Sequence, residues 1–192
     1  MTPDAVTPLY RPLSTGVTAE SSSSRRGATS GRSVRVNVAG CPLQAAMPST
    51  DIGTADQCGW YRRVLELPVV VVPRTRRIVV RRIDGLLDAV VMPSPLGEKV
   101  ATWLAMDRQL GPVIEHRDTA RTTFVTGPAD GYEHTIFATL LRLNVGLGGT
   151  HIVLPSPDDG GSGIWRWLFL PCNGFRPVMR IVLDAVVAVS AR

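Results

Sequence analysis

The chain has 192 residues with 21 Lys or Arg and 16 Asp or Glu, a formal net charge of +5. This length suits one domain with a hydrophobic core plus an extension, and the positive charge favours acidic partners such as nucleic acid. Three cysteines without a CxxC pair argue against a disulfide framework or a zinc knuckle. With no secretory signal and no apolar run of roughly 20 residues, we expect a soluble cytoplasmic protein without a membrane partner.

Residues 1–54 are rich in Ser, Thr, Pro, Gly and Ala, and SSSSRRGATSGRS has no apolar periodicity. Such a composition buries too little apolar surface to offset chain entropy, so we expect a disordered extension. The alternating VRVNV at residues 34–38 predicts one short strand within it. Residues 55–192 are then assigned to a single folded domain.

The first part of this domain predicts a helix and a β-hairpin. Apolar spacing in DQCGWYRRVLEL predicts a helix over residues 56–67, and β-branched runs predict strands at residues 69–72 and 78–80. The hairpin and the residues after it hold five arginines: Arg74, Arg76, Arg77, Arg81 and Arg82. Guanidinium groups bind phosphate bidentately, which makes these arginines candidate phosphate ligands. The alternative interpretation is a solvated hairpin tip that protects a sheet edge.

Residues 86–93 are almost all apolar and predict a central strand. An amphipathic helix follows over residues 94–110, with Ser94 as its N-cap, Pro95 at its first position and Gly111-Pro112 at its end.

The second half of the chain predicts an antiparallel arrangement. Strands are expected at residues 113–116, 122–128, 134–140, 150–155 and 164–170, and the alternation of HTIFATL pairs residues 134–140 with 122–128 in a hairpin. Apolar residues at helical spacing after Pro177 predict a closing helix. The predicted fold class is therefore α+β, a mixed or antiparallel sheet with helices packed on it. His116, next to a turn, is interpreted as surface decoration, and His151 as a structural histidine.

Three segments in succession carry a family resemblance: TGPADGYEHTIF at residues 126–137, GGTHIVLPSP at 148–157 and GIWRWLFLP at 163–171. With the order of elements from Trp60 to Pro171, they resemble the bifunctional primase–polymerase domain of the archaeo-eukaryotic primase superfamily. The resemblance implies an RRM-like primase–polymerase core and a role in DNA replication. It also gives His134 the position of the family's signature histidine, which contacts nucleotide phosphates.

The same resemblance implies a lost active site. The family holds two divalent metals with a D-x-D pair, followed by Pro and Gly, on one face of a strand. Aligned on Pro93 and Gly97, the two acidic positions fall on Val90 and Met92, which cannot bind a metal. We therefore expect no catalytic residue and no cofactor.

Three functions stay open at this stage. The leading one is a catalytically degenerate primase–polymerase-like domain with weak binding to single-stranded DNA or a nucleotide. The second is a protein-interaction module that reuses the old cleft for a protein partner. The third is an active DNA primase or polymerase, a nucleotidyltransferase that uses Mg or Mn on displaced acids such as Asp84, Asp88 or Asp118.

Overall fold

The computed structural model of the protein describes residues 53–82, 86–157 and 164–191. The expected extension over residues 1–54, its short strand and Asp84 lie outside the described residues, apart from the last two positions of the extension. Every described residue belongs to one compact unit.

The described residues alternate helices and strands in the order α1 (Thr54–Leu65), β1 (Val69–Val71), β2 (Ile78–Arg81), β3 (Asp88–Pro93), α2 (Ser94–Met106), β4 (Val113–His116), β5 (Arg121–Thr126), α3 (Tyr132–Thr135), α4 (Phe137–Arg142), β6 (Gly146–Leu147), β7 (His151–Leu154), β8 (Trp165–Phe169) and α5 (Met179–Ser190). The strands form a smaller sheet in the order β1-β2-β7 and a larger one in the order β6-β3-β5-β4-β8, and all their pairings are antiparallel. The predicted α+β class is confirmed.

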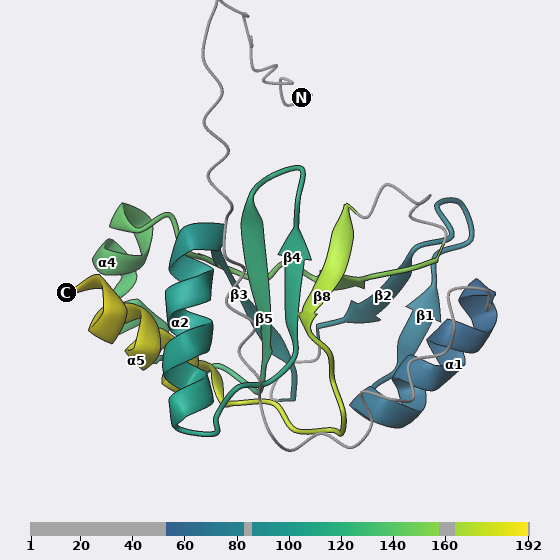
Figure 1. Ribbon diagram of the computed structural model, residues 1–192, viewed down its shortest axis with the longest axis horizontal. Coiled ribbons are helices and arrows are strands. Elements are labelled where there is room, and N and C mark those ends of the chain that lie inside the picture. The colour runs from purple at the N-terminus through teal and green to yellow at the C-terminus, as the bar shows by residue number, and fades with distance from the viewer. Residues whose placement is uncertain (1–52, 83–85, 158–163, 192) are drawn as a thin grey trace, which may run out of the picture. The chain divides into compact units, whose positions relative to one another are not determined.

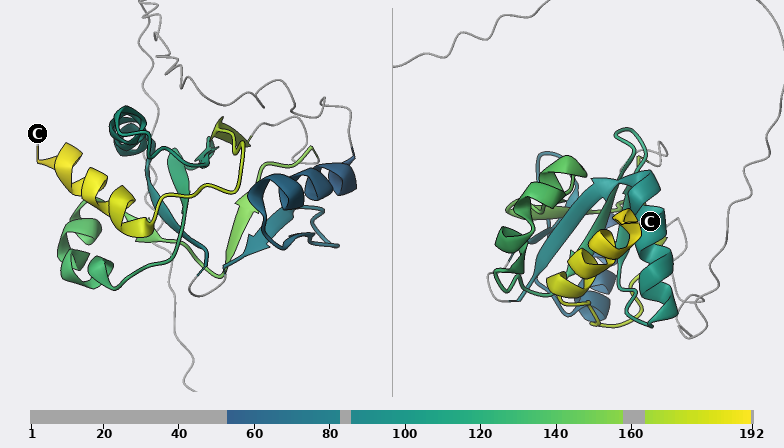
Figure 2. Two further views of the ribbon diagram at one scale, coloured as in Figure 1. Left: turned by 90° about the horizontal axis from the view of Figure 1, so that it is seen from below. Right: turned by 90° about the vertical axis from the view of Figure 1, so that its left-hand side faces the viewer.

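Helices α2 and α5 pack on one face of the larger sheet, and α1 packs on the smaller sheet (Figure 1). Seen from below, α2 and α5 lie on one side of the larger sheet, and the smaller sheet lies with α1 on the other (Figure 2). Successive strand side chains point to opposite faces, so the larger sheet contributes to two separate hydrophobic cores.

The first core fills the space between the larger sheet and its two helices. It is built by Val90, Met92, Phe124, Val100, Leu104, Val182, Leu183 and Val186, all of them almost completely buried. The second core joins α1 and the smaller sheet to the opposite face of the larger sheet, through Tyr61, Leu65, Ile78, Leu154, Ala89, Ile114 and Val125. Full burial of each large apolar side chain contributes about 1.5–3 kcal/mol. Among the described residues, α1 and the smaller sheet cover only part of this second face, and the remainder carries the candidate site.

Several predicted elements are confirmed. The hairpin forms by pairing Val69 with Val80 and Val71 with Ile78. The long amphipathic helix is present as α2, although Pro93 rather than Ser94 is the N-cap residue, because the extended conformation of Pro93 places Ser94 inside the first turn. The closing helix is present as α5.

The predicted strand over residues 134–140 is wrong, and with it the hairpin to residues 122–128. These residues form the end of α3 and most of α4, while β5 pairs with β3 and β4 instead. Ile136, Leu140 and Leu143 pack on the first core at helical spacing, and Phe137 faces solvent. The sequence satisfies both periods, and packing of the helical face decides between them.

Candidate functional site

The positions aligned with the family's metal-binding carboxylates lie in the first core. Val90 and Met92 are both 0% exposed, on the face of β3 that packs against α2 and α5. A carboxylate here would lose its hydration without gaining a charged partner, at a cost of several kcal/mol. These two positions do not fit a pair of divalent cations, so no metal-dependent step is derived from them.

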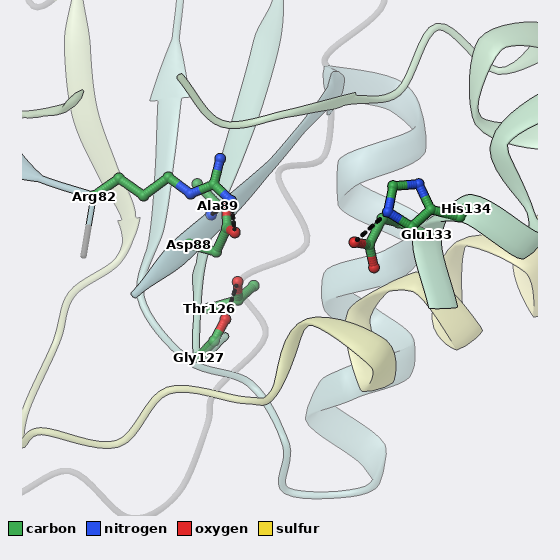
Figure 3. A network of polar contacts seen from close by, with 7 residues as sticks. All are labelled: Arg82, Asp88, Ala89, Thr126, Gly127, Glu133 and His134. Atoms are coloured by element: carbon green, nitrogen blue, oxygen red, sulfur yellow. Dashed lines mark hydrogen bonds and ion pairs between the residues drawn. The ribbon is translucent and has the colours of Figure 1, made fainter. Parts of the chain in front are cut away.

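The nearby acid Asp88 is committed to an ion pair (Figure 3). Arg82 Nη2 lies 2.8 Å from Asp88 Oδ2, and the backbone N–H of Ala89 donates to Asp88 Oδ1 over 2.9 Å. The Asp88 side chain is only 4% exposed. Asp118 lies exposed in the turn after β4. Within the described residues, no group of three or more His, Cys, Asp or Glu side chains could hold a metal ion.

His134 is not brought together with the arginine cluster. Its side chain is 84% exposed on α3, and its Nε2 lies 3.7 Å from Oε1 of the buried Glu133 (Figure 3). Helix α3 packs against α5, whereas the β1–β2 hairpin, whose turn holds Arg74, Arg76 and Arg77, lies at the other end of the described fold (Figures 1 and 2). His134 therefore cannot share one phosphate with the hairpin arginines.

A cation and two aromatic rings meet on the uncovered part of the larger sheet. The imidazole of His116 stacks on the indole of Trp165 with ring centroids 5.3 Å apart and planes 23° apart. Arg77 places its Cζ 4.8 Å from the centroid of the same indole. We call these three residues the Arg–Trp–His stack.

Strand register explains why the stack forms. Strands β4 and β8 pair so that His116 lies opposite Trp165, and opposite residues point to the same face of a sheet. Strand β8 lies between β4 and β2 in Figure 1, and Arg77 immediately precedes β2. The imidazole and the guanidinium thus reach the indole from different segments of the chain.

A hydrogen bond to β5 anchors the His116 end of the stack. His116 Nε2 lies 3.0 Å from the hydroxyl of Thr123 on β5. Burial lowers the pKa of His116 below its usual 6.5, Asp118 opposes that effect and Arg121 adds to it. The imidazole is therefore mostly neutral at pH 7. The Arg121 guanidinium is itself anchored, because its Nη2 donates to the carbonyls of Val91 and Asn144.

The five candidate arginines have different environments. Arg74, Arg76 and Arg77 are exposed around the hairpin turn, next to the stack. Arg81 is exposed on β2 and pairs in register with His151, which is itself exposed rather than structural. Arg82 is held by Asp88. Arg74, Arg76 and Arg77 thus lie together around one exposed turn as candidate phosphate ligands.

The sequence analysis missed two residues of the stack. His116 was interpreted as surface decoration, yet it is half-buried, stacked and hydrogen-bonded. Trp165, which lies opposite His116 across the β4–β8 pair, was not identified as a site residue at all. The missing information was the pairing of β4 with β8, which joins segments about 50 residues apart.

Comparison of the chain with protein-family models, with curated proteins and with solved structures gave no significant match. None of the described helices is long and apolar enough to cross a membrane.

Proposed function

We propose that this protein is a catalytically inactive, primase–polymerase-like domain that binds single-stranded nucleic acid through the open part of its larger sheet. The observation that carries the proposal is the Arg–Trp–His stack, flanked by the exposed Arg74 and Arg76. Proteins that bind single strands combine a positive surface along the backbone with aromatic side chains next to the bases. The stack and the hairpin turn bring both features to one place.

The chemistry favours a single strand over a duplex. Guanidinium groups contact phosphates of either form, whereas an indole contacts the face of a base only when that base is unpaired. Three arginines at the turn would neutralise about three phosphates, which gives a slope of log affinity against log salt of about −2 for a single strand. Such binding is weak and strongly dependent on salt.

The inactive half of the proposal is supported by β3. Val90 and Met92 contribute to the first core and are closed off by α2 and α5, and Asp88 is paired with Arg82. Primer extension with Mg²⁺ and with Mn²⁺ tests this half. Metal-dependent synthesis that disappears in Asp88→Ala would instead support the active primase or polymerase.

Fluorescence anisotropy with a labelled oligothymidine of about 15 nucleotides tests the binding half. We expect binding at about 50 mM NaCl that weakens about 20-fold at about 200 mM. The variant Arg74→Ala/Arg76→Ala/Arg77→Ala should lose most of this binding. Arg142→Ala is the matched control, because Arg142 is exposed on α4, away from the hairpin. Absence of binding at low salt, or equal loss in both variants, would contradict the proposal.

A second candidate function, a protein-interaction module, is favoured by one observation on α4. Phe137 and Leu141 are 57% and 63% exposed and lie four residues apart on the same helix face. Exposed apolar pairs of this kind occur at protein interfaces. A stoichiometric partner that co-purifies with the protein and with Arg77→Ala, but not with Phe137→Ser/Leu141→Ser, would favour this function over nucleic-acid binding.

A further inference from the structure

The two partners of the Trp165 indole are held differently. On the β4 side, His116 is half-buried, cross-strand to Trp165 and hydrogen-bonded to Thr123. On the hairpin side, Arg77 is exposed, and its guanidinium makes no ion pair with any described residue. The imidazole therefore fixes the ring in place, while the guanidinium contact can exchange.

An unpaired nucleobase is a stronger partner for an indole than an exposed guanidinium. A base stacks over a large aromatic area, whereas the cation–π contact of an exposed arginine competes with hydration of the cation. A guanidinium displaced from the ring gains a bidentate contact with phosphate. Exchange of Arg77 for a base thus replaces one weak contact with two stronger ones.

We propose that Trp165 is the nucleobase platform of this protein and that Arg77 occupies it only in the absence of nucleic acid. When a single strand binds, one base stacks on the indole, and Arg77 turns from the ring to a neighbouring phosphate. His116 keeps its contact with the ring throughout. This inference rests on the proposed single-strand binding and identifies an unpaired base, together with phosphate, as the recognised chemistry.

An abasic oligonucleotide separates base contacts from phosphate contacts. The full chain is titrated, in parallel, with an oligothymidine and with a strand of the same length that lacks bases. Stacking of a single base predicts at least about 5-fold tighter binding of the oligothymidine. Trp165→Ala should reduce this ratio to about one, Trp165→Phe should retain part of it, and Arg142→Ala should leave it unchanged.

Arg77→Ala tests the exchange itself. Loss of one phosphate contact should reduce the salt effect between about 50 and 200 mM NaCl from about 20-fold to about 7-fold. Because the indole is already uncovered in this variant, its preference for the oligothymidine over the abasic strand should equal or exceed that of the unsubstituted protein. A smaller preference would contradict the proposal that Arg77 occupies the indole only until a base replaces it.

Tryptophan fluorescence provides a second measurement if Trp165→Ala fails to fold. Saturating unlabelled oligothymidine should quench the emission of the protein, and Trp165→Phe should remove that quenching while Trp60, Trp103 and Trp167 remain. Quenching that persists in Trp165→Phe, or equal affinity for both strands, overturns this inference and leaves the proposed function standing. Failure of the oligothymidine to bind at about 50 mM NaCl overturns both.

Discussion

The imidazole of His116 lies 5.3 Å from the indole of Trp165, centroid to centroid, and joins β4 to β8 on the uncovered face of the larger sheet. Like other cross-strand aromatic pairs, this one fixes the orientation of both side chains. Here it also presents the indole to Arg77. Stability and binding are therefore expected to depend on the same imidazole.

Protonation of His116 should destabilise the fold. Burial lowers its folded pKa below the unfolded value of 6.5, so between these two values the unfolded chain binds more protons. The stabilisation is present above pH 6.5 and is lost as the pH falls through 6.5 toward the folded pKa. Urea unfolding of the protein and of His116→Phe, at several pH values from about 5 to 8, measures this effect. The free energy of unfolding should decrease at acidic pH, and the decrease should be smaller in the variant. An identical decrease in both proteins would mean that titratable groups other than His116 cause the loss of stability.

Carboxylates at the two β3 positions aligned with primase–polymerase metal ligands should damage the core instead of creating a metal site. Val90→Asp/Met92→Asp places two charges beneath α2 and α5, and we expect a loss of at least about 3 kcal/mol or insoluble protein. Val91→Asp, on the opposite and half-buried face of β3, is the matched control and should be tolerated better. A soluble double variant whose melting temperature rises with Mn²⁺ would contradict the orientation of β3.

Elements with an unambiguous period could be predicted from the sequence, and elements with two compatible periods could not. The β-branched hairpin and the Val-rich α5 belong to the first group. Residues 134–140 belong to the second, because Ile136 and Leu140 satisfy both the strand and the helix pattern. Gly131, with φ of 87°, turns the chain after β5, and packing of α3 on α5 then stabilises the helical conformation.

The site was predicted only in part for a different reason. Composition and the local run of arginines pointed to the hairpin, since clustering of charge along the chain is visible directly. The aromatic half depends on the strand order β5-β4-β8, which is a non-local property. Any of several antiparallel orders satisfies the same alternation. Only the observed order places the ring of His116 on Trp165 and beside Thr123.

The Arg82–Asp88 ion pair should contribute to stability. Arg82→Ala removes the guanidinium that lies 2.8 Å from the nearly buried Asp88 carboxylate, and breaking such a pair costs about 3 kcal/mol. Chemical denaturation at neutral pH measures this loss, with Arg81→Ala as the exposed control, expected within about 0.5 kcal/mol of the unsubstituted protein. Equal stability of the two variants would mean that the pair is dispensable.

Two helical glycines should respond in opposite ways to alanine. A Cβ at Gly97 on α2 would lie 2.8 Å from Thr122 Cβ on β5, so Gly97→Ala forces the helix off the sheet and should cost about 1–3 kcal/mol. A Cβ at Gly59 on α1 meets only the flexible end of Arg63, at 3.7 Å. Gly59→Ala should therefore stabilise the helix by about 0.5–1 kcal/mol through its lower entropy cost. Thermal unfolding of both variants measures the two signs, and a stabilising Gly97→Ala would show that α2 does not pack this closely against β5.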